Sequence, residues 1–262
     1  LQGPFDLTVL DKRLLTVTPA GNGTGTVTSN PVGIDCGADC TELVDPGTVV
    51  TLTAIADTGS TFTGWSGDCV GTGSCLLTMT ETKHVTATFT TYTTATLPLS
   101  PSWNLIGLPV QPLTPLTAQG LLDMVNSQGN TCTEIARWHN GGWDSHIDGM
   151  PFNNFTIEMG HGYFVECTGF GSWDLPGTTL SSSVALSIQA SWNLIAIPYS
   201  SGYTAQTLLD ALNSQGNTCT EVDRWQSGGW DSHIDGLPFN DFTIEVDEGY
   251  FVSCSSGGSF TP

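Results

Sequence analysis

The sequence NTCTEIARWHNGGWDSHIDG at residues 130–149 returns as NTCTEVDRWQSGGWDSHIDG at residues 217–236. When each stretch is extended to the next cysteine, 28 of 38 positions are identical. The match also reaches back to two copies of SWNLI, which begin at Ser102 and Ser191. Self-similarity of this kind indicates structural modules in tandem. We place the two copies at residues 95–177 and 178–262.

Within each copy the apolar pattern changes along the chain. Runs at residues 103–108 and 192–197 have the composition of strands, and the proline after each run ends the strand. Helices are predicted at residues 118–127 and 205–214, where leucines recur at helical spacing behind a threonine suited to the N-cap. The segments with Cys, Gly-Gly and Trp that follow are typical of further strands and a turn. The sequence therefore predicts two β-rich modules, each with one short helix.

Residues 14–92 have a different pattern. Threonine and apolar residues alternate in runs such as LTVT from Leu15, VTLT from Val50 and HVTATF from His84. This alternation is typical of half-buried antiparallel strands, and the segments between the runs are rich in glycine. We expect an all-β module here, preceded by a separate arm at residues 1–13. The predicted fold class of the whole chain is mainly β.

Six segments of this first module are similar to one known family. They are LTVT at 15–18, GTV at 25–27, GIDC at 33–36, VTLTA at 50–54, FTGWSG at 62–67 and VTATF at 85–89. Together they resemble the divergent internalin-type B repeat of bacterial surface proteins. The resemblance implies a small β-grasp-like spacer or adhesion module on a bacterial exterior, without catalytic residues. Residues 95–262 resemble, more loosely, a tandem Trp-Asn-Leu-Ile…Gly-Tyr-Phe repeat of bacterial extracellular proteins, which implies no particular activity.

Composition restricts the partners and the compartment. The chain has 25 Asp and Glu against 5 Lys and Arg, a formal charge of −20, which argues against binding to nucleic acid or anionic membranes. No run of about eighteen apolar residues is present, so we expect no membrane span. The chain begins at Leu1 rather than Met, as expected after removal of a signal peptide. We expect an extracellular or cell-surface protein.

Eight cysteines support the same compartment. They fall as Cys36/Cys40, Cys69/Cys75, Cys132/Cys167 and Cys219/Cys254. Their even number and the absence of a C-x-x-C pair predict disulfides in an oxidising environment rather than zinc sites. Among the first four we expect local pairing, with Cys36–Cys69 and Cys40–Cys75 as the alternative.

Two groups of residues in the repeat are candidate ligand contacts. Trp138, Trp143, Trp225 and Trp230 occupy matched positions, and they either belong to the cores or form a sugar-stacking platform. The WDSHIDG segments place two carboxylates and an imidazole close together, a combination that ligates cations in other proteins. The candidate ligands are Asp144, Asp148, Asp231 and Asp235. The alternative is an Asp-Gly turn in which the carboxylates bind local backbone N–H groups, and we expect no metal and no cofactor.

Catalytic signatures are absent from the sequence. There is no G-x-S-x-G, no H-E-x-x-H and no phosphate-binding glycine loop. Acidic residues are so numerous that any pair of carboxylates carries little information. We therefore expect a protein that is not an enzyme.

The arm at residues 1–13 suggests a mode of assembly. Phe5, Leu7 and Val9 alternate with other residues and give the segment one apolar face. This strand either pairs with its own module or adds to a sheet of a neighbouring subunit. Head-to-tail exchange that does not close generates a filament. Our interpretation is a secreted structural protein that forms a filament with copies of itself, and the alternative is a monomeric adhesin or carbohydrate-binding module.

Electron microscopy of the intact chain beside a chain lacking residues 1–13 tests the filament. Strand exchange predicts fibres that disappear with the deletion, because the donor strand is then missing. Fibres that persist would place the contact elsewhere. Dispersed particles in both samples would contradict filament formation.

Overall fold

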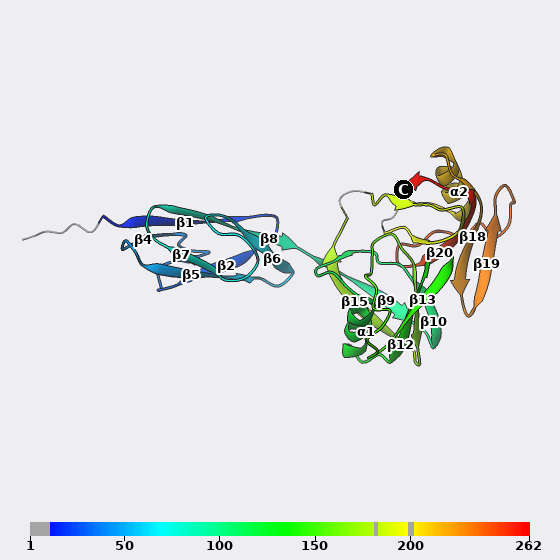
Figure 1. The fold of residues 1–262 in the computed structure, drawn as a ribbon, viewed down its shortest axis with the longest axis horizontal. Coiled ribbons are helices and arrows are strands. Elements are labelled where there is room, and N and C mark those ends of the chain that lie inside the picture. Colours follow the sequence, from blue (N-terminus) through cyan, green and yellow to red (C-terminus); the bar gives the residue numbers. More distant parts are fainter. Residues whose placement is uncertain (1–10, 181–182, 199–201) are drawn as a thin grey trace, which may run out of the picture. The chain divides into compact units, whose positions relative to one another are not determined.

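The computed structural model describes residues 11–180, 183–198 and 202–262. The chain divides into two compact units, Leu1–Tyr92 and Thr93–Pro262 (Figure 1). Strands predominate in both units, which confirms the predicted mainly-β fold class. The described helices are ten residues each, and neither is long and apolar enough to cross a membrane.

The first unit contains two four-stranded sheets. One has the order β4-β1-β8-β6 and the other the order β3-β2-β5-β7. The strands are β1 (Arg13–Ala20), β2 (Gly25–Asn30), β3 (Asp35–Cys36), β4 (Thr41–Val44), β5 (Val49–Ala56), β6 (Ser60–Gly67), β7 (Cys75–Thr78) and β8 (Lys83–Thr91). β1 pairs parallel with β8, and the other pairings are antiparallel. Alternate apolar residues such as Leu15, Leu52 and Phe89 are buried in its core, as the alternation predicts.

The eight cysteines form four disulfides. In the first unit the pairing is local, Cys36 with Cys40 and Cys69 with Cys75, rather than crossed. In the second unit each disulfide joins two neighbouring antiparallel strands of one sheet.

In the second unit both copies of the repeat form the same structure. Each has a four-stranded antiparallel sheet, in the order β10-β14-β12-β13 or β17-β20-β18-β19, and one helix. The strands of the first sheet are β10 (Ser102–Ile106), β12 (Cys132–His139), β13 (Gly142–Ile147) and β14 (Tyr163–Cys167), and its helix is α1 (Ala118–Ser127). Those of the second sheet are β17 (Ser191–Ala196), β18 (Thr218–Gln226), β19 (Gly229–Ile234) and β20 (Gly249–Ser256), with α2 (Ala205–Ser214).

Short strands complete each copy. β9 (Thr93–Leu99), β11 (Gln111–Pro112) and β15 (Gly171–Thr178) form a three-stranded sheet beside the first copy, and β16 (Leu186–Ser187) pairs with β21 (Ser259–Phe260) beside the second. These strands contribute residues such as Trp173 and Phe260 to the helix-side cores.

Both helices begin and end where the sequence predicts. The Thr117 side chain accepts a hydrogen bond from the N–H of Gly120, and Thr204 caps the second helix in the same way. Just beyond each helix stands a glycine, Gly129 or Gly216, with a φ of 92°. That left-handed conformation suits glycine and ends the helix.

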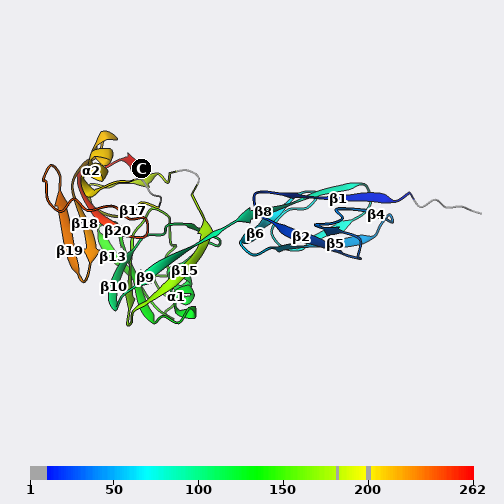
Figure 2. The same ribbon diagram turned by 180° about the vertical axis from the view of Figure 1, so that it is seen from behind.

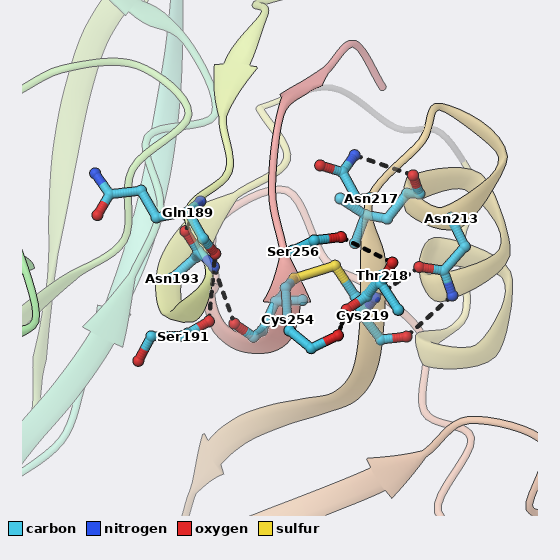
Figure 3. The surroundings of a disulfide bond; sticks show 12 residues. Gln189, Ser191, Asn193, Asn213, Asn217, Thr218, Cys219, Cys254 and Ser256 are labelled. Carbon is cyan, nitrogen blue, oxygen red and sulfur yellow. Dashed lines mark hydrogen bonds between the residues drawn. A yellow bond between two sulfur atoms is a disulfide. The ribbon is translucent and has the colours of Figure 1, made fainter.

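An asparagine of each helix fixes the adjoining cysteine strand. In the second copy the Asn213 amide donates to the carbonyl of Cys219 at 3.0 Å and accepts from its N–H at 2.7 Å (Figure 3). The disulfide from Cys219 to Cys254 then connects β18 to β20. The first copy repeats the arrangement with Asn126 and Cys132. Helix, disulfide and sheet are thus joined within each copy.

Each sheet has a helix on one face and the other copy on its second face (Figure 2). Backbone hydrogen bonds cross between the copies in a reciprocal pair. The N–H of Gly107 donates to the carbonyl of Asp247 at 2.8 Å, and the N–H of Ala196 donates to that of Gly160 at 2.9 Å. Because the repeats are equivalent and their contacts reciprocal, the two copies are related by a pseudo-twofold arrangement.

The glycine of each Gly-Tyr-Phe segment permits this close approach. A Cβ on Gly162 would lie 2.9 Å from Cδ1 of Leu194 and 3.2 Å from Cα of Gly249. A Cβ on Gly249 would lie 3.1 Å from Cα of Gly162. The two backbones therefore touch where a side chain would separate them.

Substitution of Gly249 by Ala is expected to destabilise the second unit by about 1–3 kcal/mol, because the added methyl overpacks the contact between the copies. Urea unfolding followed by tryptophan fluorescence measures the change. Gly169→Ala is the matched control, since a Cβ there meets no atom within 4 Å. Equal stabilities of the two variants would contradict the close contact.

Candidate functional site

Strand alternation decides which residues of the repeat reach the space between the copies. Leu105 and Phe164 lie between the two sheets. Their chain neighbours Ile106 and Tyr163 point the other way, into the core beneath α1. Successive residues of a strand face opposite sides. The SWNLI and Gly-Tyr-Phe segments therefore each supply side chains both to the space between the sheets and to the core beneath the helix.

Aromatic side chains dominate the layer between the sheets, which we call the aromatic layer. Its members are Trp103, Trp138, Trp143 and Phe164 from the first copy and Trp192, Trp225, Trp230 and Phe251 from the second. The indole N–H of Trp138 donates to the carbonyl of Trp192 at 3.0 Å, and that of Trp225 donates to the carbonyl of Trp103 at 3.0 Å. Each copy therefore binds the SWNLI strand of the other, β10 or β17, through an indole.

Trp143 and Trp230 lie at the solvent side of the aromatic layer. Their exposed fractions are 51% and 46%, which is high for tryptophan. Each ring contacts both Phe164 and Phe251, with centroids 5.6–6.0 Å apart and planes inclined at 70–76°. These edge-to-face contacts hold the two rings in place while part of each stays accessible.

Two hollows open beside this pair of tryptophans, and both copies line each of them. The first, the Glu134 hollow, has a volume of about 300 Å³ and is lined by Trp103, Glu134, Ala136, Trp143, Ser145, Phe164, Trp225 and Trp230. The second, the Asp223 hollow, measures about 220 Å³ and is lined by Trp138, Trp143, Trp192, Asp223, Trp230 and Phe251. Each residue that lines the Asp223 hollow occupies the same repeat position as a residue that lines the Glu134 hollow. Neither hollow has Lys or Arg in its described lining.

The hollows differ at one matched position, where the first copy has Ala136 and the second Asp223. Among the described residues, Oδ1 of Asp223 is buried and has no hydrogen-bond partner. Burial raises the pKa of Asp223, although contacts with Ser232 and Glu221 act in the opposite direction. The pKa of Glu221 is raised as well, first by burial and then by the charge of Asp223. The Asp223 hollow therefore contains a carboxylate that lacks a counter-charge.

Both arginines of the repeat lie on the other face of their sheets. Arg137 pairs with Asp144 at 3.2 Å, and its guanidinium lies 4.4 Å from the ring centroid of Phe155. Arg224 makes the equivalent contacts with Asp231 and Phe242. These are structural contacts of the two copies, and they leave the negative charge of the hollows uncompensated.

The remaining residues of the WDSHIDG segments connect hairpin and helix. Asp148 accepts a hydrogen bond from the Gln119 amide at 2.6 Å, and Asp235 accepts one from Gln206 at 2.7 Å. His146 is fully buried, with one ring nitrogen 2.8 Å from Oε1 of Gln119. The four candidate metal ligands thus accept hydrogen bonds from glutamine and arginine side chains, rather than from the local backbone N–H groups of the turn interpretation. Within the described residues no group of three or more metal-binding side chains occurs.

The structure brings the four predicted tryptophans together in one aromatic layer. It adds Trp103, Trp192, Phe164 and Phe251, which the sequence pattern alone does not mark as contacts. Asp223 was also missed, although the Ala136/Asp223 difference between otherwise similar repeats was a visible signal. The predicted assembly residues Phe5, Leu7 and Val9 lie outside the described residues.

The comparisons with known proteins concern the first unit. Residues 14–93 match the family described as the divergent InlB B-repeat domain, which confirms the resemblance found in the sequence. No curated protein and no solved structure matches the chain. A domain of this family indicates a bacterial surface protein, and the disulfides fit an extracellular location.

Replacement of Asp223 by Ala, the residue of the first copy, is expected to stabilise the second unit at pH 7. A carboxyl whose pKa is raised on folding lowers stability as pH rises, from about 4 in the unfolded chain through the higher folded value. The gain is about 1 kcal/mol or less, because the carboxyl is partly exposed and water screens it.

Urea unfolding of both proteins between pH 3.5 and 7.5 measures this difference. The advantage of the variant should be full at pH 7 and absent below about pH 4, where the carboxyl is protonated in both states. A variant that is less stable than the natural chain at pH 7 would contradict the unpaired carboxylate.

Proposed function

We propose that the chain is a secreted bacterial surface protein of the adhesin type, in which the tandem repeat binds an extracellular ligand. The binding surface is the aromatic layer around Trp143 and Trp230. Residues 14–92 serve as a spacer or adhesion module, and the protein has no catalytic role.

One observation carries the proposal. Two half-exposed tryptophans stand side by side with hollows that both copies line. Exposure of such rings costs free energy that burial would recover, about 25 cal/mol for each Å² of apolar surface. A contiguous aromatic patch flanked by cavities is typical of a binding site rather than of a closed core.

The duplication supports the same proposal. The hollows exist because the two copies meet, so a single repeat would lack one wall of each. Residues such as Trp143 serve both hollows at once. Two similar sites on one rigid unit favour attachment to a surface that presents the ligand many times.

An array of immobilised bacterial and eukaryotic surface glycans, probed with the intact chain, tests the binding. Trp143→Ala and Trp230→Ala are each expected to weaken binding about tenfold, since an aromatic contact with ligand contributes roughly 1–2 kcal/mol. The control is Phe170→Ala, which removes an aromatic ring that is 85% exposed and lines neither hollow.

Binding that the tryptophan variants leave unchanged would place the contact elsewhere. Failure to bind any member of the array, with the variants folded and as stable as the natural chain, would contradict the adhesin proposal.

A further inference from the structure

The repeat supplies an internal comparison for the carboxylate of the Asp223 hollow. Both copies build the same sheet and contribute the same rings to the aromatic layer. At the matched position the first copy has Ala136, which is buried there and packs without a polar group. The aromatic layer therefore forms without a carboxylate at this position, and packing does not explain Asp223.

The carboxylate of Asp223 lies in an environment that opposes its charge. Its Oδ1 atom is buried without a hydrogen-bond donor among the described residues, and Glu221 stands two residues away on the same face of β18. The side chain is only partly buried and contacts Ser232 and Glu221, but neither contact supplies a positive charge. A carboxylate oxygen shielded from water without a donor is destabilising, so a cation supplied from outside the chain would complete the site.

The walls of the hollow restrict what that cation is. Neighbouring rings meet at steep angles: 77° for Trp138 and Trp143, 76° for Trp143 and Phe251, 71° for Trp230 and Phe251, and 84° for Trp192 and Phe251. Rings arranged in this way form steep walls around an open hollow of about 220 Å³, rather than one flat face for a sugar. The lining contains few groups that accept hydrogen bonds.

These constraints favour one kind of cation. A primary ammonium is strongly hydrated and would leave N–H donors unsatisfied against aromatic walls. A metal ion needs several oxygen, nitrogen or sulfur ligands, and the hollow offers one carboxylate. A quaternary ammonium has no N–H, is weakly hydrated and is attracted to aromatic faces by the cation–π interaction.

We propose that the Asp223 hollow binds a trimethylammonium group, with the rings as walls and Asp223 as the counter-charge. This inference rests on the adhesin proposal and specifies the ligand chemistry of its site. The group would be presented on an extracellular polymer or headgroup, where the formal charge of −20 on the chain assists its approach.

Calorimetric titration of the intact chain with choline tests the proposal. The matched probe is 3,3-dimethylbutan-1-ol, which has the shape of choline without its charge. We expect saturable binding of choline and about tenfold weaker binding of the neutral alcohol, because the alcohol lacks the cation–π and carboxylate contacts.

Variants at the matched position test the role of the carboxylate. Asp223→Asn retains the shape of the side chain, and Asp223→Ala reproduces the first copy. Both are expected to lower choline affinity about tenfold, while urea unfolding shows that neither is less stable than the natural chain. Trp192→Phe, which keeps an aromatic wall, should reduce the affinity less than either Asp223 variant.

Several outcomes overturn the inference: no choline binding, equal affinity for choline and its neutral analogue, or choline affinity unchanged in both Asp223 variants. The two proposals fail separately. Glycan binding that depends on Trp143 and Trp230, combined with no choline binding, removes the trimethylammonium assignment and leaves the adhesin proposal intact. Loss of both kinds of binding contradicts both.

Discussion

The close contact between the two sheets of the tandem repeat is the constraint on which the rest of the second unit depends. Gly162 and Gly249 allow the backbones to meet, and the indoles of Trp138 and Trp225 then reach main-chain carbonyls of the opposite copy. A copy separated from the other copy would expose an aromatic sheet face and leave an indole N–H without this acceptor. Hydrophobic burial and hydrogen-bond satisfaction therefore act together to join the copies.

The same contact explains why the SWNLI motif is repeated and why a difference between the copies at one position matters. In SWNLI, the Trp103 carbonyl accepts a hydrogen bond from the indole N–H of Trp225. Asn104 holds the turn at Ser100 through two hydrogen bonds, and Leu105 enters the aromatic layer. These functions are structural and are required in both copies. The change from Ala136 to Asp223 leaves the scaffold intact but places a carboxylate at a position where the first copy has a methyl group. A duplicated scaffold can thus retain its packing while one of its two sites acquires a separate chemistry.

Much of this fold was predictable because its signals are local. Thr117 and Thr204 begin the helices through side-chain hydrogen bonds, and Gly129 and Gly216 end them through a left-handed backbone. The equal separation of 35 residues in two cysteine pairs indicates their disulfides. The aromatic layer was not predictable, since both faces of these strands are apolar and alternation does not tell which face meets a helix and which meets a second sheet. For the same reason the sequence could not separate partly buried Trp138 from the more exposed Trp143. Assembly through residues 1–13 stays a prediction.

Hydrogen exchange at the indole N–H groups of Trp138 and Trp225, measured by NMR on the intact chain, reports whether the two sheets meet as described. Both indole N–H groups donate across the aromatic layer, so we expect their protons to exchange slowly and to lose protection together in denaturant. The exposed indoles of Trp143 and Trp230 provide the reference for unprotected exchange. If Trp138 and Trp225 exchange as fast as these, the two copies do not form one unit and the shared hollows do not exist.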